Sequence, residues 1–385
     1  MDYHGNRLQL LCNGREYFPA LLAVISTARR EVFIESYLFE ADDIGRAVSA
    51  ALIRAARRGV ATHLLVDGFG AHGLPPALRR SLQQGGVRLL FFRPEPHFLH
   101  LDRQRLRRLH RKLAVIDGHT GFVGGINILA DTTDAAGLAP RYDYAVQVNG
   151  PLAAEIRKVC ASQWRRTAWM QLKPELGRLP PAPPCPPRLG KHSARLVRRD
   201  NLRHRRDIEH AYLQAMRNAR QEIVLANAYF LPGLTFRHAL LAARARGIRV
   251  VLLLQGRIDH LLLHYASRVL YRPLLQAGVE IHEYQAGFMH AKVGVIDREW
   301  FTVGSSNIDP FSLLTAREAN LVARDAQLAG QLRDDIQRHI DHDALAVPQS
   351  LLRRGRLITV LSWLAYQLVR LLLGITGYGR REYRE

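Results

Sequence analysis

The same uncommon string occurs twice in this chain, about half its length apart. It reads LHRKLAVIDGHTGFVGGINI at 109–128 and MHAKVGVIDREWFTVGSSNI at 289–308. Both copies contain His-x-Lys, then Asp after four further residues, and both end in a glycine-containing turn followed by Asn. So many residue types at one spacing indicate an internal duplication. We therefore expect two similar halves.

Looser repeats surround the two copies and predict the fold class. Each repeat contains an apolar strand, and the basic helix ends that precede two of the strands are also repeated. The order strand–helix–strand–helix–strand before each copy predicts an α/β fold of two similar domains related by a pseudo-twofold axis, each a mixed sheet flanked by helices. The matching stretches are 28–39 with 219–230, 55–68 with 242–256, and 85–92 with 277–284.

A proline-rich stretch, LKPELGRLPPAPPCPP, separates the halves. Proline at this density cannot continue a helix or a sheet and favours extended chain, so it is typical of an interdomain linker. We expect an N-terminal domain at 1–171, a linker at 172–190 and a second domain at 191–345. A chain of 385 residues is long enough to give each domain a core of its own.

The net charge and the cysteines limit which partners and which cellular compartment are plausible. A formal net charge of +21, nearly all from arginine, predicts an anionic partner, and both nucleic acid and an anionic membrane remain open. Cys12, Cys160 and Cys185 have neither zinc spacing nor a plausible disulfide framework, so we expect free thiols in a reducing compartment. The N-terminus lacks a signal-peptide pattern. His97 and His100 lack companion ligands, so no metal site is predicted.

The C-terminal stretch 351–385 differs from both halves. Residues Leu357–Tyr378 are apolar apart from Arg370 and a few neutral polar residues, and arginines flank them. As a helix this stretch would be roughly 33 Å long. A narrow polar stripe at helical spacing favours a helix lying in the membrane interface. The alternative is a buried helix packed on the second domain.

Each motif begins on a strand, which determines which side chains point the same way. Residues two apart on a strand share a face, so His110 lies beside Lys112, and His290 beside Lys292. Asp117 and Asp297 are at an odd offset, and we expect them to hold the hairpin. The residues expected to contact a phosphate are Gly125, Asn127, Ser305 and Asn307.

Imidazole, ammonium, amide and carboxamide groups together suit a phosphate ester. Lysine supplies charge to the phosphoryl oxygens, and the amides hydrogen-bond them. A neutral histidine can attack phosphorus, and a protonated one can supply the leaving alkoxide with a proton. One motif contains one histidine. Two motifs contain a nucleophile and an acid, which explains the repetition.

The doubled pattern resembles the phospholipase D superfamily over residues 5–345, and within it most closely the bacterial cardiolipin synthases of the B type. The resemblance implies one site at the domain interface, a phosphohistidine intermediate and no metal or cofactor. It implies His110 as nucleophile and His290 as acid, and counts Asp117 and Asp297 with the catalytic motif. Lys112, Lys292, Asn127 and Asn307 are then expected to hold the phosphate.

The resemblance also implies a carboxylate behind each histidine, which fixes the imidazole tautomer. Asp143, in RYDYAVQV, follows His110 along the chain, and Glu318, in REANLV, follows His290. Both lie where apolar strands begin. The first motif has Gly125 where the second has Ser305, so the two half-sites are not equivalent.

These features predict a phosphatidyltransferase that uses phosphatidylglycerol as donor and acceptor, peripheral on the cytoplasmic side of the inner membrane. Other anionic phospholipids and the membrane surface are its expected partners. The alternative is a phosphodiesterase of the same superfamily, acting on phospholipid or nucleic acid. Nucleic acid is less favoured, because a soluble nuclease does not need the apolar tail. A non-catalytic binder of DNA or membrane is disfavoured by the two intact motifs.

Overall fold

A computed structural model describes most of the chain, and the fold is mixed α/β, as the repeats predicted. The described residues are 1–94, 107–131, 139–200, 203–258, 261–309, 316–348, 362–364, 366–368 and 371.

The two halves build one sheet rather than two. In the described part of the chain, fifteen strands form a continuous sheet, and β1 pairs with β9 where the halves meet. From that junction outward the order is β1-β8-β6-β5-β2-β3-β4 in the first half and β9-β16-β15-β14-β10-β11-β12-β17 in the second. The prediction of a separate sheet in each half is therefore wrong, because the first strand of each half pairs with the other.

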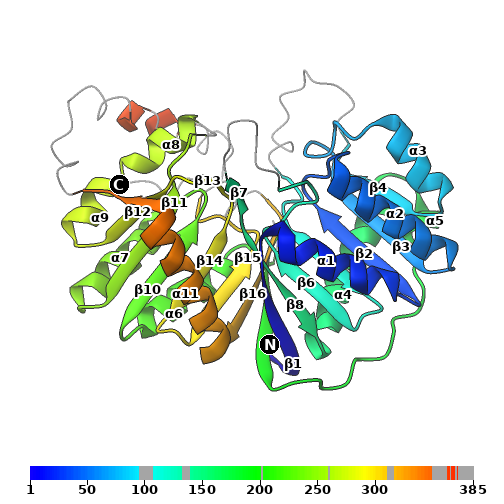
Figure 1. The fold of residues 1–385 in the computed structure, drawn as a ribbon, viewed down its shortest axis with the longest axis horizontal. Helices are drawn as coiled ribbons and strands as arrows, with labels where there is room; N and C mark the ends of the chain where they lie inside the picture. The colour runs from blue at the N-terminus through cyan, green and yellow to red at the C-terminus, as the bar shows by residue number, and fades with distance from the viewer. Residues whose placement is uncertain are drawn as a thin grey trace.

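The strands of the first half are β1 (Tyr3–Cys12), β2 (Glu31–Ser36), β3 (Ala61–Asp67), β4 (Arg88–Phe92), β5 (Lys112–Ile116), β6 (Thr120–Gly124), β7 (Ala139–Tyr142) and β8 (Tyr144–Asn149). Those of the second are β9 (His192–Arg199), β10 (Glu222–Asn227), β11 (Arg249–Gln255), β12 (Glu280–Tyr284), β13 (Gly287–Met289), β14 (Lys292–Ile296), β15 (Trp300–Gly304), β16 (Glu318–Arg324) and β17 (Ala344–Ala346). β7 and β13 form a separate parallel pair between the halves (Figure 1).

Helices cover both faces of the sheet, so its central strands are buried on both sides. The helices are α1 (Asn13–Ser26), α2 (Asp43–Arg57), α3 (Pro76–Gln84), α4 (Pro151–Met170), α5 (Pro174–Gly177), α6 (Asp207–Asn218), α7 (Leu234–Ala245), α8 (Leu261–Arg268), α9 (Tyr271–Gln276) and α11 (Ala326–Asp343).

One apolar core joins the halves. On α4, buried residues recur at helical spacing, among them Ile156, Cys160 and Trp164. They pack in the same cluster as Leu332 and Ile336 of α11, from the second half. The other face of each half has a core of its own. The shared core fixes how the halves sit relative to each other.

The predicted linker is partly ordered against the first half. Its beginning forms the short helix α5, and from Arg178 to Gly190 it has no regular structure. The chain there is held by bonds to its carbonyls. Arg88 donates to the carbonyl of Arg178 at 3.0 Å, and Arg157 donates to that of Pro180 at 3.3 Å.

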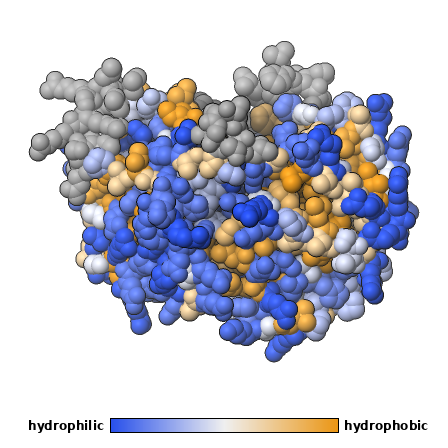
Figure 2. Space-filling model, viewed as in Figure 1, coloured by the Kyte–Doolittle hydropathy of each residue, from blue (hydrophilic) through white to orange (hydrophobic). Residues whose placement is uncertain are grey.

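The C-terminal stretch is described only at 362–364, 366–368 and 371, where it is helical, and the rest of the predicted membrane-associated tail lies outside the described residues. Tyr366 packs into the second-half core, so this part contacts the protein. Four apolar side chains are exposed instead: Trp363, Leu364, Leu368 and Leu371. Among the described residues, every helix is too short or too polar to cross a bilayer. Figure 2 shows further apolar surface near α8.

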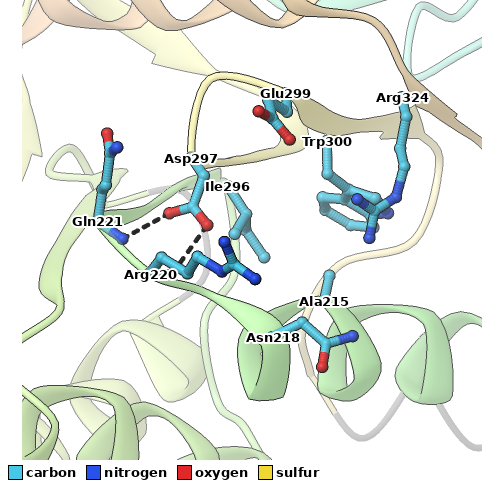
Figure 3. A pocket seen from close by; sticks show the side chains of 9 residues that line it. All are labelled: Ala215, Asn218, Arg220, Gln221, Ile296, Asp297, Glu299, Trp300 and Arg324. Atoms are coloured by element: carbon cyan, nitrogen blue, oxygen red, sulfur yellow. Dashed lines mark hydrogen bonds between the residues drawn. The ribbon is translucent and has the colours of Figure 1, made fainter.

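Asp117 and Asp297 tie each motif to the neighbouring strand. The Asp117 carboxylate accepts bonds from the backbone N–H groups of residues 29–31, at 2.8–3.0 Å. Asp297 does the same with residues 220–222. Figure 3 shows its bonds to Arg220 and Gln221. Both have positive φ, 53° and 55°, and both lie at the far ends of β5 and β14 from the histidines. They therefore have a structural role. This corrects the expectation, implied by the resemblance, that they belong with the catalytic residues.

The replacement Asp297→Ala should lower stability by about 2 kcal/mol, because three backbone donors lose their acceptor. A fall in the apparent melting temperature measures this loss. The matched control is Asp43→Ala, whose carboxylate is exposed and paired with an exposed Arg46. Equal melting temperatures for the two variants would contradict the structural role.

Candidate active site

His110 and His290 lie where the two halves meet. Each histidine precedes a central strand, β5 or β14, and donates its backbone N–H to the opposite half. His110 bonds to the carbonyl of Arg317 at 3.0 Å, and His290 to that of Tyr142 at 2.7 Å. The imidazole side chains are mostly buried, 16% and 14% exposed. The structure thus brings the two motifs to one junction.

Each imidazole is held by a carboxylate from the opposite half. The Nδ1 atom of His110 lies 2.9 Å from Glu318 Oε1, and that of His290 lies 2.6 Å from Asp143 Oδ2. The prediction that each carboxylate serves the histidine it follows in the chain is therefore wrong. The reason is the backbone pairing across the junction. The residue before each carboxylate accepts the N–H of the other half's histidine, so the carboxylate next to it reaches that imidazole.

Gly125 and Ser305 contact these carboxylates rather than an open phosphate site. The Ser305 hydroxyl is fully buried, hydrogen-bonds to Glu318 Oε2 and accepts from Ala319 N at 3.1 Å. A Cβ at position 125 would lie 2.3 Å from Asp143 Oδ1. This placement corrects the prediction that both residues contact phosphate. It also explains why the two positions differ. The Ser305 hydroxyl bonds to Glu318, whereas a side chain at position 125 would collide with Asp143.

Lys112 and Lys292 are buried beside the histidines. Lys112 Nζ donates to the carbonyl of His110 at 2.5 Å, and Lys292 Nζ donates to that of His290. Burial is the largest cause that lowers the pKa of Lys112 to about 7 and that of Lys292 to about 8, against the opposing pull of Glu318 and Asp143. Two buried ammonium groups without full compensation favour an anionic ligand.

Asn127 has a donor available at the junction. Its Oδ1 accepts the N–H of Leu38 at 3.1 Å, and its Nδ2 is buried with no hydrogen-bond partner among the described residues. A buried donor in this state calls for an acceptor such as a ligand oxygen. Asn307 occupies the same place after β15 and is equally buried.

Burial also shifts the acid–base groups of the junction. Desolvation lowers the pKa of both histidines, assisted by the lysine charges, and the effect on His290 is the larger. Burial raises the pKa of Asp143 to about 7. Burial therefore favours the neutral forms of Asp143, His110 and His290.

Sequence reasoning missed the groups that position the histidines from behind. The Asp67 carboxylate accepts the N–H of Leu109 at 2.7 Å, and Gln255 Oε1 accepts that of Met289 at 2.7 Å. A signal was present, because LLVDG and LLLQG end matched strands with these polar residues.

The residue after the histidine differs between the halves. Arg111 follows His110 and forms a buried ion pair with Glu35, whereas Ala291 follows His290.

Asn13 was missed for a different reason. Its backbone N–H donates to the Asp143 carbonyl at 2.8 Å, while its Oδ1 accepts the Asp143 N–H at 2.9 Å. The left-handed backbone of Asn13, with φ of 59°, permits this reciprocal pair. No sequence pattern connects positions so far apart.

Among the described residues, no cluster of His, Cys, Asp or Glu could hold a metal ion.

Comparisons with known proteins identify the family of this chain. The family profile described as cardiolipin synthase, PLD-like domain, matches residues 21–164 and 212–340. Cardiolipin synthase B of Escherichia coli (strain K12) is 36% identical over 385 residues, covering 97% of this chain and 90% of that protein. Cardiolipin synthase A of Pseudomonas putida (strain W619) is 31% identical over 329 residues, covering 85% of this chain and 67% of that protein.

Among solved structures, phosphatidylserine synthase of Haemophilus influenzae Rd KW20 has the same fold. The TM-score is 0.70 at 13% identity, covering 96% of this chain and 93% of that one. The resemblance to the superfamily is thereby confirmed, and the chain belongs to the cardiolipin synthase family of phospholipase D-like proteins.

Proposed function

We propose that this chain is a phosphatidyltransferase that makes cardiolipin from two molecules of phosphatidylglycerol through a phosphohistidine. The observation that carries the proposal is the crossed pair of His–carboxylate bonds. Each bond occupies Nδ1 and leaves Nε2 of the imidazole for chemistry. Two buried lysines and Asn127 Nδ2 beside them suit the oxygens of a phosphodiester. The relatives named cardiolipin synthase support the choice of substrate.

In the first step, Nε2 of neutral His110 attacks the phosphorus of the donor. A P–N bond forms, the P–O bond to the headgroup glycerol breaks, and His290 protonates the departing alkoxide. The Asp143–His290 pair suits the acid role because burial raises the pKa of Asp143 to about 7, which makes a carboxyl proton available beside Nδ1 of His290. The charge of the bound phosphodiester favours transfer of that proton from Asp143 to His290.

In the second step, His290 removes the proton from a hydroxyl of the acceptor's glycerol headgroup. The new alkoxide attacks phosphorus, the P–N bond breaks, and His110 is restored. The lysine ammonium groups and the asparagine amides stabilise the charge on the phosphoryl oxygens in both steps. Water in place of the acceptor would give hydrolysis with the same residues.

The location we propose is the cytoplasmic side of the inner membrane, as a peripheral protein. Three arguments support it. Phospholipid substrates lie in a bilayer, the net charge of +21 favours an anionic surface, and apolar side chains of the C-terminal stretch are exposed. The same charge also supports the second candidate, a phosphodiesterase acting on nucleic acid, because basic proteins bind polyphosphate chains.

The first prediction tests the reaction. Vesicles of labelled phosphatidylglycerol should give cardiolipin with the wild-type protein, and His110→Ala and His290→Ala should each lower the rate by about a thousandfold or more. Lipid chromatography measures the product. Phosphatidic acid alone would show a hydrolase. No lipid turnover, together with cleavage of single-stranded DNA, would show a nuclease.

The second prediction concerns pH. Lys112 and Lys292 lose their charge as the pH rises through about 7 and 8, so kcat/KM should fall on the alkaline side of neutrality. Loss of the Asp143 proton acts in the same direction. Bound substrate raises the lysine pKa values, so the fall in kcat should lie at higher pH.

The variant Lys112→Arg separates the effect of the lysine charge from that of the Asp143 proton, because a guanidinium stays charged. The fall in kcat/KM should move to higher pH in this variant if loss of the lysine charge is its main cause. A wild-type kcat/KM that stays level from pH 7 to about 9 would contradict the role of the lysine charges.

A further inference from the structure

An apolar patch is exposed at the carboxyl end of α4, in the first half. We define it as Trp169, Met170 and Leu172. Their exposed fractions are 76%, 48% and 89%. Large apolar side chains this exposed and this close together are uncommon, and such patches mark interaction sites.

The backbone holds this patch in a defined conformation. Leu172 has a φ of 56°, which a leucine rarely adopts. Its N–H donates to the carbonyl of Trp169 at 3.1 Å, and that of Lys173 donates to Ala168 at 3.0 Å. The Gln171 amide donates to the carbonyl of Phe91 in β4. The apolar side chains are therefore presented by a fixed turn.

The patch lies at the same end of the sheet as the histidines. Phe91 is near the carboxyl end of β4, and at the carboxyl end of the adjacent β3, Asp67 holds the backbone next to His110. In Figure 1, α5, which follows the patch directly, lies at the right-hand edge of the molecule. The second half has exposed apolar residues after β11, at Ile258 and at Leu261, the first residue of α8. Figure 1 shows α8 at the upper left. Apolar groups thus flank the junction on both sides.

The charge beside the patch suits an anionic surface. Arg165, Arg166 and Lys173 are exposed around it, with Glu175 as the nearby acid. Tryptophan and leucine next to arginine and lysine are typical of segments that bind anionic bilayers, where the apolar groups enter the headgroup region and the cations meet phosphate.

We infer that the patch at Trp169, Met170 and Leu172 is a membrane-docking site of the first half, which binds the surface of a bilayer containing anionic phospholipid. With the apolar residues of the second half it would hold the junction of the two halves against the lipid surface. The inference rests on the proposed function, because it takes a bilayer as the source of substrate.

The test is the double variant Trp169→Gln/Leu172→Asn. Asparagine tolerates positive φ, so the turn is retained while the apolar surface is lost. The matched control is Leu189→Gln, which removes an exposed apolar side chain from the linker, beside Gly5 of β1. Binding is measured by co-sedimentation with phosphatidylglycerol vesicles, and turnover on the same vesicles and on dissolved short-chain phosphatidylglycerol.

The double variant should bind these vesicles about tenfold more weakly and turn them over correspondingly more slowly. Its turnover of the dissolved lipid should equal that of the wild type, which also shows that it is folded. The Leu189→Gln variant should match the wild type throughout. A second variant, Arg165→Gln/Lys173→Gln, should lose preference for phosphatidylglycerol over phosphatidylcholine vesicles.

Unchanged vesicle binding by the double variant would overturn the inference. So would a wild-type dimer, seen by light scattering, that the double variant converts to monomer, because the patch would then join two copies. If the wild type turns over neither lipid form, the proposed function fails. Sedimentation still decides whether the patch binds a bilayer.

Discussion

The site depends on two hydrogen bonds that cross between the halves, from His110 to Glu318 and from His290 to Asp143. Neither half contains a complete His–carboxylate pair. Such bonds hold their geometry only if the halves are fixed relative to each other to within a few tenths of an ångström. The continuous sheet through β1 and β9 and the apolar core shared by α4 and α11 provide that rigidity. The fold thus holds the two halves in the relative position that both His–carboxylate bonds require.

The duplication could be read from the sequence with good accuracy. The repeated strings place both histidines, both lysines and the order of elements, because strand periodicity and matched spacing are local properties. The partner of each carboxylate could not be read. Asp143 and Glu318 lie on chain segments that pair with the other half, and pairing between distant strands leaves no local pattern. For the same reason the repeats do not predict that the two halves share one sheet.

Side-chain roles within the motif were also beyond the sequence. Ser305 offers a hydroxyl that suits phosphate, yet in the fold it is fully buried against Glu318. Asp117 and Asp297 belong to the motif, yet they bind backbone at the opposite strand ends. Residue type indicates what chemistry a side chain can perform. Only its neighbours decide whether it meets the substrate, since burial and geometry select one contact among several.

The most direct test of the crossed site is nuclear magnetic resonance of the protein labelled with nitrogen-15 in histidine alone. The Nδ1 nitrogen signals of His110 and His290 are assigned by their loss in His110→Gln and His290→Gln. Glu318→Gln should shift the signal of His110 and leave that of His290 nearly unchanged, and Asp143→Asn should do the reverse. If each substitution instead shifts the histidine of its own half, the crossed arrangement is contradicted.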